Sequence, residues 1–302
     1  MSRKRKSSKG PPTERAESRL LVSYAFDLAR QLGISKILVL ADLLQDRRSI
    51  ETLRKDEKII WVVRGEGAAE QIEKVKGDSY VEIPETEVGR MDQVKLGLIM
   101  SVLNGAIDVD ESLVCLTGVA GSKRLDNLLI ANPGRDFPGF AGRSFESSDS
   151  LLASSQFARL LDIALRFGKE GREGKPIGTT FVLGDPDAME RFSRPLIMNP
   201  LKGHGKKVRN IQNAEFLETL RELASLDGAF IVGEGGVVES AGVYLDAPLT
   251  KSVTVPKGLG ARHTAAAAVS AKADAVAIVV SESSGTISVF SQGSAILEIG
   301  QR

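Results

Sequence analysis

Cysteine and histidine are scarce in this sequence, and each scarcity excludes a class of site. The 302 residues include one cysteine and two histidines. Cys115 therefore cannot form a disulfide within the chain or build a cysteine zinc cluster. It lies in an apolar run at residues 113–116, which is typical of a small core residue.

Several catalytic signatures are also missing. The sequence contains no G-x-x-x-x-G-K-[ST] loop, no H-E-x-x-H helix and no G-x-S-x-G turn. These absences disfavour a P-loop ATPase and remove the commonest signatures of metalloproteases and serine hydrolases.

Long apolar runs and an excess of one charge are missing as well. No run approaches the roughly 20 apolar residues of a transmembrane helix, and no apolar signal core follows the basic start. The net charge of +1 predicts no bulk attraction to nucleic acid or to a membrane. We expect a cytoplasmic protein whose residues 1–13 form a disordered basic tail, since they combine Lys and Arg with Gly, Pro and Ser.

Strand and helix patterns alternate through the first half of the sequence. Apolar runs predict strands at residues 36–41, 59–63, 80–83 and 113–117, and helical patterns cover residues 14–32, 49–55, 65–76 and 91–104. In the first helix, one side carries Leu20, Leu21, Tyr24, Leu28 and Leu32. Continuous apolar strands between helices predict a Rossmann-like parallel sheet covered on both faces, and we expect this α/β domain to span residues 14–134.

A break in the pattern separates this domain from the second half. Residues 135–150 are rich in Pro, Gly and Ser, which indicates a linker, and a second domain is expected over residues 151–302. Its predicted helices cover residues 151–167, 213–223 and 262–272, with a further helix capped by Asp185 and begun by Pro186. Its predicted strands cover residues 179–183, 229–232, 237–245, 275–280 and 286–290. The second and third of these form a hairpin, so this domain should be α/β with a mixed sheet.

Two glycine-rich turns in the first half are weak ligand signals. Residues 65–70 follow a strand and open a helix, as a dinucleotide fingerprint does, but Glu70 replaces the third glycine. Residues 118–122 follow the next strand and offer an anion site only as a minor interpretation. A structural connection is the better interpretation of both.

The chemistry concentrates in the last quarter of the chain. Asp227, Gly228 and Ala229 place a carboxylate at the mouth of a buried strand. A carboxylate there is costly unless it meets water, a donor or a cation, and a divalent ion carrying phosphate oxygens would satisfy it.

A second element suited to phosphate begins at Gly258, Leu259 and Gly260. The glycines allow close backbone approach, and the helix that starts near Arg262 directs N–H groups and its positive dipole end at the same place. Arg262 adds a planar fork for phosphate oxygens and His263 a further donor. The alternative, an Arg-His pair at a solvated helix start, is opposed by the small alanines 265–268, which favour tight packing.

Two further groups keep alternatives open. Glu282, which with Ser281 ends the strand at residues 275–280, is either a surface residue or a partner of Asp227 at a shared metal. His204 lies in the basic loop at residues 202–207, which either attracts phosphate or is simply solvated.

Taken together, these residues resemble the diadenylate cyclase domain, which condenses two ATP into cyclic di-AMP and releases two pyrophosphates. The resemblance covers residues 151–301 and is carried by Asp227-Gly228-Ala229, Arg262-His263-Thr264, Ser281-Glu282 and residues 174–179. The first half resembles, less closely, the C-terminal α/β domain of pyruvate kinase, and this pairing is similar to archaeal-type diadenylate cyclases. Many bacterial members have a second arginine where this chain has Thr264.

The resemblance implies a role for each site residue. Asp227 would bind the metal and orient the 3′-hydroxyl, Glu282 would complete the shell of Mn²⁺ or Mg²⁺, and Arg262, His263 and Ser281 would hold the triphosphate. The residues expected to bind ATP are Gly228, Ala229, Leu245, Gly258, Leu259, Gly260, Thr264, Ser281 and Ser283. Two domains would face each other in a homodimer or larger homo-oligomer, so a monomer should be inactive.

Two other functions use parts of the same sequence. A non-catalytic nucleotide sensor would use the same pocket and leave the first domain as its effector. A Rossmann-type redox enzyme would centre on residues 65–70. The cyclase is favoured because it alone uses all three C-terminal motifs.

Overall fold

The computed structural model describes residues 14–44, 47–56, 58–65, 79–141, 151–250, 253 and 258–300. The basic tail, most of the helix expected at residues 65–76 and most of the expected linker lie outside the described residues. The contacts divide the chain into two compact units. The first unit comprises Met1–Glu82 and Glu111–Asn132, and the second comprises Ile83–Asp110 and Pro133–Arg302.

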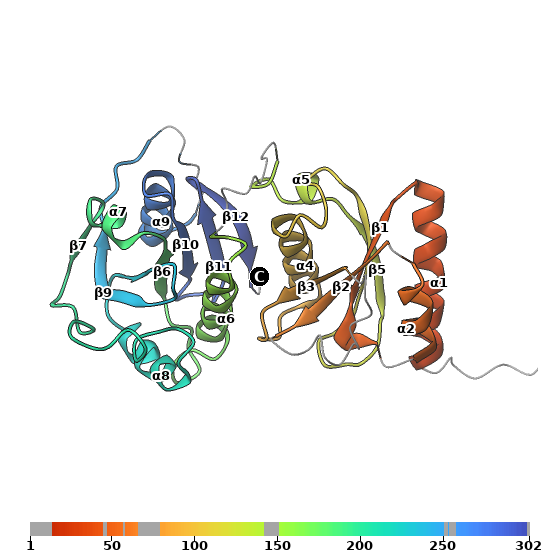
Figure 1. Cartoon of the computed structure of the whole chain (residues 1–302), viewed down its shortest axis with the longest axis horizontal. Coiled ribbons are helices and arrows are strands. Elements are labelled where there is room, and N and C mark those ends of the chain that lie inside the picture. The colour runs from red at the N-terminus through yellow and green to blue at the C-terminus, as the bar shows by residue number, and fades with distance from the viewer. Residues whose placement is uncertain are drawn as a thin grey trace, which may run out of the picture. The chain divides into compact units, whose positions relative to one another are not determined.

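The first unit is built on a five-stranded sheet with the order β3-β2-β1-β4-β5 (Figure 1). The strands are β1 (Lys36–Leu40), β2 (Ile59–Arg64), β3 (Ser79–Ile83), β4 (Leu113–Thr117) and β5 (Asn127–Ala131). β1 pairs in parallel with both β2 and β4, which confirms the predicted parallel sheet. β5 was not predicted, and it pairs antiparallel with β4 because a short connection returns the chain directly.

Among its described residues, this unit has the helices α1 (Glu14–Leu32) and α2 (Arg47–Arg54) and a 3-10 turn at Ala41–Leu43. α1 has the predicted bounds and packs against β1 and β4. Its buried positions are Ser18, Val22, Ala25 and Ala29, whereas Leu20, Tyr24 and Leu32 of the predicted apolar side are exposed. The small side chains face the sheet because they allow the helix to approach it closely.

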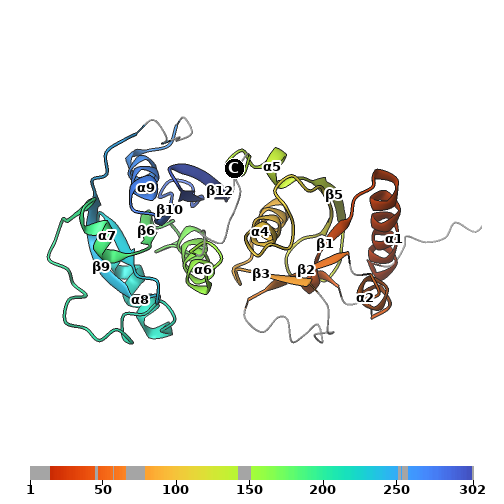
Figure 2. The ribbon, with the colours of Figure 1, turned by 45° about the horizontal axis from the view of Figure 1, so that its top comes forward.

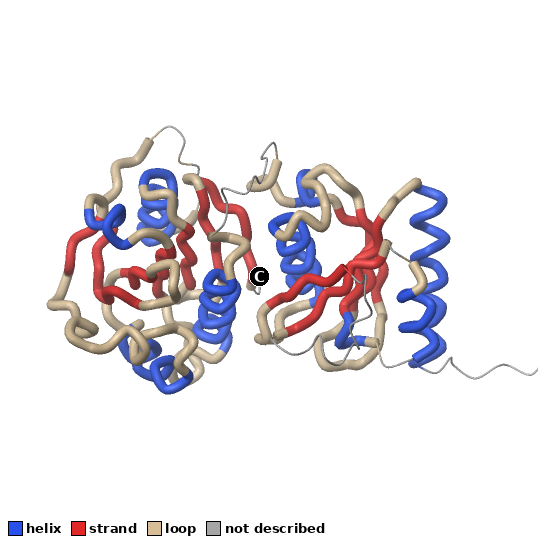
Figure 3. Tube along the Cα trace, viewed as in Figure 1, coloured by secondary structure: helices blue, strands red, loops and turns tan. Residues whose placement is uncertain are grey.

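The second unit contains a seven-stranded mixed sheet with the order β12-β11-β10-β6-β8-β9-β7. β6 and β8 are parallel, and the other five neighbouring pairs in this sheet are antiparallel. The strands are β6 (Thr179–Leu183), β7 (Ser193–Pro195), β8 (Ala229–Val232), β9 (Val238–Leu245), β10 (Val276–Val280), β11 (Ile287–Ser291) and β12 (Ser294–Ile299). The mixed sheet and the β8–β9 hairpin are as predicted, whereas β7 and β12 were not foreseen. In Figure 3 the strands of each unit lie together, with helices alongside.

The helices of the second unit are α4 (Arg90–Leu103), α5 (Pro133–Asp136), α6 (Ser155–Lys169), α7 (Pro186–Glu190), α8 (Ala214–Leu223) and α9 (Ala261–Lys272). Asp185 caps α7 by accepting from the Asp187 N–H, as predicted. No helix in the described part of the chain is long and apolar enough to cross a membrane.

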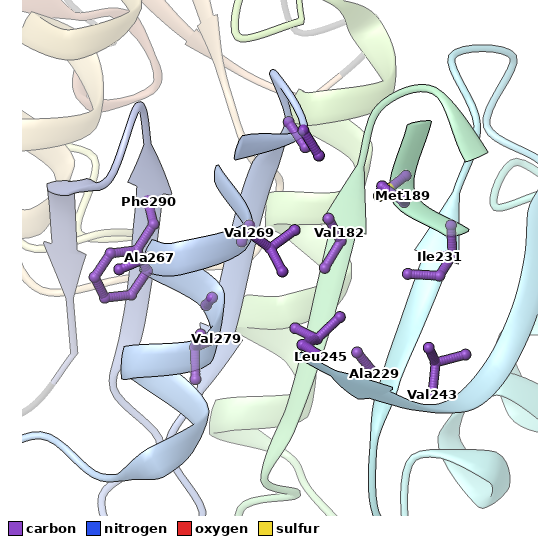
Figure 4. Close-up of a cluster of buried hydrophobic side chains, with 14 residues drawn as sticks. Val182, Met189, Ala229, Ile231, Val243, Leu245, Ala267, Val269, Val279 and Phe290 are labelled. Atoms are coloured by element: carbon purple, nitrogen blue, oxygen red, sulfur yellow. The ribbon is translucent and has the colours of Figure 1, made fainter. Parts of the chain in front are cut away.

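The helices α6 and α9 cover opposite faces of the second sheet (Figure 2). Phe181 of β6 contacts the ring of Phe167 on α6, whereas its neighbour Val182 belongs to the core beneath α9. Successive residues of a strand point to opposite faces, so the two contacts place the helices on different sides. Figure 4 shows the core on the α9 side, where Ala267 and Val269 pack near Val182, Val279 and Phe290.

The buried carboxylate of Asp162 on α6 fastens the segment before α4 to the rest of the second unit. Its Oδ1 accepts from the Thr86 N–H at 2.9 Å and from the Thr86 hydroxyl at 2.8 Å. Its Oδ2 accepts from Arg166 at 3.0 Å, and Arg166 also donates to Glu85 at 2.8 Å. The segment at residues 85–86 is thereby held against α6.

We expect Asp162→Ala to lower the free energy of unfolding by about 3 kcal/mol, because it removes a buried carboxylate that accepts from the half-buried Thr86 and leaves Arg166 only the exposed Glu85 as acceptor. Urea denaturation followed by circular dichroism measures this loss. Glu218→Ala serves as the control, since its carboxylate is 74% exposed and its ion pair with Arg221 at 3.6 Å should contribute less than about 1 kcal/mol. Equal losses in the two variants would contradict the role given to Asp162.

Candidate active site

Three segments that are distant in the sequence meet at the guanidinium of Arg262. Its Nη2 lies 3.4 Å from Asp227 Oδ1, and its Nη1 lies 3.2 Å from Glu282 Oε2. Asp227 precedes β8, Arg262 lies in the first turn of α9, and Glu282 follows β10. The structure therefore brings together one charged residue from each of the three predicted motifs. We call Asp227, Arg262 and Glu282 the charged triad.

The triad lies on an open surface of the second unit. The side chains of Asp227 and Glu282 are 89% and 71% exposed, and that of Arg262 is 39% exposed. Exposed ion pairs contribute little to stability, so the triad contributes little to holding the fold. Its charges remain accessible to a ligand that approaches from outside.

Gly228 fixes the position of Asp227. Its φ is +109°, in the region that favours glycine, and a Cβ at this residue would lie 2.6 Å from the backbone nitrogen of Val243 on β9. Asp227 therefore stands at the start of β8, where the neighbouring strand passes very close.

Gly178, just before β6, lies beside Arg262 and Glu282. Because it has no side chain, it leaves the space that these two residues occupy. A Cβ at this position would lie 2.8 Å from Arg262 Nη1 and 2.5 Å from Glu282 Cβ. Gly178 belongs to the motif at residues 174–179, but no role in the site was predicted for it. Nothing in the local sequence signals this contact, because it depends on residues about 80 and 100 positions away.

The N-terminus of α9 is shaped by glycine as predicted. Gly260 is the N-cap residue and has no side chain with which to cap, and its carbonyl accepts from the N–H groups of His263 and Thr264. Gly258 has a φ of +94°, and a Cβ there would meet nothing within 4 Å. The first amides of a helix lack partners within the helix, so this open start suits an anion.

His263 lies differently from its neighbour. It is 8% exposed, and its ring meets Phe290 of β11 edge-on, with 6.1 Å between the ring centroids. Burial lowers the pKa of His263; the charge of Glu298 raises it, and that of Arg262 lowers it further. The imidazole packs beneath the start of α9, whereas the guanidinium of Arg262 extends to Asp227 and Glu282.

The remaining residues that were predicted to contact nucleotide or phosphate lie in several different settings. Ser281 and Ser283 lie on the loop between β10 and β11, and their hydroxyl oxygens are 3.2 Å apart. Ala229 and Leu245 are buried in the core beneath α9, and Leu259 packs against the same core. Thr264 directs its hydroxyl to the Gly260 carbonyl at 3.5 Å. His204, in the basic loop, is exposed.

The donor set of the triad suits a hard divalent cation. Mg²⁺ and Mn²⁺ prefer oxygen ligands, and Mg²⁺ is typically held by one or two carboxylates together with phosphate and water. Asp227 and Glu282 supply two carboxylates beside an anion-binding helix start. No group of three or more His, Cys, Asp or Glu that could hold a metal is found among the described residues, so the remaining ligands would come from phosphate and water.

Comparison with known proteins gives matches that include these residues. Residues 166–295 match the DAC family, described as DisA bacterial checkpoint controller nucleotide-binding. A diadenylate cyclase of Methanocaldococcus jannaschii is 30% identical over 290 residues, which cover 92% of this chain and 91% of that protein. The chain belongs to the diadenylate cyclase family.

Other members of the diadenylate cyclase family match over shorter stretches. A diadenylate cyclase of Haloferax volcanii is 31% identical over 229 residues, covering 74% of this chain and 81% of that protein. The diadenylate cyclase CdaS of Bacillus thuringiensis is 45% identical over 62 residues, covering 20% of this chain and 29% of that protein. The chain is therefore an enzyme of this family, and two archaeal members match it over most of its length. The likeness of the first domain to pyruvate kinase stays a prediction.

We expect the imidazole of His263 to titrate below its ordinary pKa of 6.5, because burial disfavours its charged form. The unfolded chain then binds a proton more readily than the folded chain, so stability falls as the pH drops from about 6.5 through the lowered pKa. NMR of the imidazole protons measures the pKa, and His204→Gln leaves a single signal to assign. A midpoint at or above 6.5 would contradict the buried position.

Proposed function

We propose that this protein condenses two ATP into cyclic di-AMP and two pyrophosphates. Each 3′-hydroxyl oxygen attacks the α-phosphorus of the other ATP, the bond from that phosphorus to the bridging oxygen breaks, and pyrophosphate leaves. Each hydroxyl loses its proton in the step. The observation that carries the proposal is the convergence of Asp227, Arg262 and Glu282, from three separate motifs, in a chain of the diadenylate cyclase family.

Phosphoryl transfer requires mainly positioning and charge neutralisation from the protein. The planar guanidinium of Arg262 suits phosphate oxygens, and the open start of α9 adds N–H groups beside it. Ser281 and Ser283 offer hydroxyl donors on the adjacent loop. Together these groups would hold the triphosphate and the departing pyrophosphate.

The carboxylates have a different task. Asp227 would orient the 3′-hydroxyl and accept its proton, and Asp227 and Glu282 would hold Mn²⁺ or Mg²⁺. The bound ion supplies neutralisation of the phosphate charge. Since burial disfavours the charged form of His263, this residue would support the start of α9 from below as a neutral ring.

A face-to-face homodimer follows from the reaction. Two α-phosphates and two 3′-hydroxyls must meet, and each second unit carries one charged triad. The high exposure of Asp227 and Glu282 supports this arrangement, because their own chain leaves them open to a second copy and its nucleotide.

We expect Asp227→Asn to reduce cyclic di-AMP formation by at least about a thousandfold, because the amide is a poor base and a weaker metal ligand. Chromatography of the products with Mn²⁺ or Mg²⁺ present measures the rate, and fluorescent ATP binding checks that the pocket persists. Asp246→Asn is the control, since this exposed carboxylate pairs only loosely with Arg194 at 3.9 Å. Saturable ATP binding without product in the unchanged chain would instead indicate a nucleotide sensor.

We also expect the specific activity to rise with protein concentration, because the reaction needs two facing triads. Turnover measured across a dilution series, together with the mass of the particles by light scattering, tests this. Activity should fall in step with the dimer or larger assembly. Constant specific activity in a sample that is monomeric throughout would contradict the dimeric site.

A further inference from the structure

Arg262 contacts the two carboxylates to which the proposed function assigns the metal. The guanidinium donates to Asp227 at 3.4 Å and to Glu282 at 3.2 Å, one amino group to each. The planar guanidinium presents its amino groups in a fixed geometry, which suits two acceptors placed side by side. One side chain therefore pairs with both carboxylates at once.

A divalent cation and the guanidinium compete for these carboxylates. Both are positive and both are attracted to the same oxygens, and at short range the two cations repel each other. The triphosphate is attracted to the guanidinium by the opposite sign of charge. A metal–nucleotide complex thus offers a new partner to every member of the triad, whereas a metal alone offers a partner only to the carboxylates.

We propose that Arg262 is a positioning residue that competes with the metal ion for Asp227 and Glu282. Without nucleotide, its pairing with the two carboxylates weakens their binding of the metal. When the metal arrives with ATP, Arg262 releases both carboxylates. The triphosphate takes the guanidinium while the cation takes the carboxylates, so the two ligands strengthen each other's binding. By linkage the coupling is reciprocal: ATP raises the affinity for the cation as much as the cation raises the affinity for ATP. This inference rests on the proposed function for the identity of the ligands.

The surroundings of the triad support this role. The absence of a side chain at Gly178 leaves space in which Arg262 Nη1 and the Cβ of Glu282 both lie. The side chains of Asp227 and Glu282 are mostly exposed, so exchange of partners requires no opening of the core. Exposed pairs of this kind are weak, which makes them replaceable by a ligand.

The test is the affinity for Mn²⁺ without nucleotide, measured by electron paramagnetic resonance of the free ion. We expect Arg262→Gln to bind Mn²⁺ about five- to tenfold more tightly than the unchanged chain, because a competing cation is removed. The same variant should bind ATP more weakly. Arg262→Met provides a second variant with the same expectation, and circular dichroism checks that each variant is folded.

A matched control exists on the same unit. Arg221 also bridges two exposed carboxylates, Glu170 at 3.2 Å and Glu218 at 3.6 Å. Arg221→Gln should leave the Mn²⁺ affinity unchanged, because its carboxylates lie outside the site. The double variant Asp227→Asn with Arg262→Gln should lose the gain, since one of the released carboxylates is gone.

Each outcome decides the proposal. A gain confined to the Arg262 variants and abolished by Asp227→Asn supports it. Unchanged or weaker Mn²⁺ binding in the Arg262 variants overturns it, as does an equal gain in Arg221→Gln or a gain that survives in the double variant. Cyclic di-AMP formation by the unchanged chain is measured alongside. If the unchanged chain makes cyclic di-AMP but the Arg262 variants do not bind Mn²⁺ more tightly, only this inference is contradicted. If the Arg262 variants bind Mn²⁺ more tightly but the unchanged chain makes no cyclic di-AMP, only the proposed function is contradicted.

Discussion

The interaction on which the site depends is the pairing of one guanidinium with two carboxylates from separate segments. Arg262 reaches Asp227 and Glu282 because the start of α9, the entry to β8 and the end of β10 lie at the same end of the second sheet. The pairs themselves stabilise little, since they are exposed. The convergence is enforced by the packing beneath them.

That packing is made from small residues and close backbone approaches. Ala266 and Ala267 are fully buried, which allows α9 to lie closely on the sheet. Gly228 allows the start of β8 to pass next to β9, and Gly178 leaves room for the triad. The chain therefore positions its charged groups through alanine and glycine residues that have no reactive side chain. Substitutions at the two glycines would displace the site without removing a charge.

Local sequence patterns were sufficient to predict most of the helices and strands and the residues of the candidate site. They were not sufficient to predict which residues contact one another. The bounds of α1 and the β8–β9 hairpin follow from apolar spacing and turn residues, which act over a few positions. The side of α1 that packs inward was not predictable, because the sheet selects Val22, Ala25 and Ala29 over the larger leucines. Likewise the residue types of Arg262 and His263 suggested two phosphate ligands. Burial of His263 against Phe290 depends on β11, far along the chain.

The most direct test of the proposed site is a crystal structure of the full chain with Mn²⁺ and a non-hydrolysable ATP analogue. We expect Arg262 to leave the carboxylates for the phosphates and Asp227 and Glu282 to contact the metal. The second units of two chains should face each other across the nucleotides. A nucleotide bound elsewhere, with Arg262 still bridging Asp227 and Glu282, would contradict it.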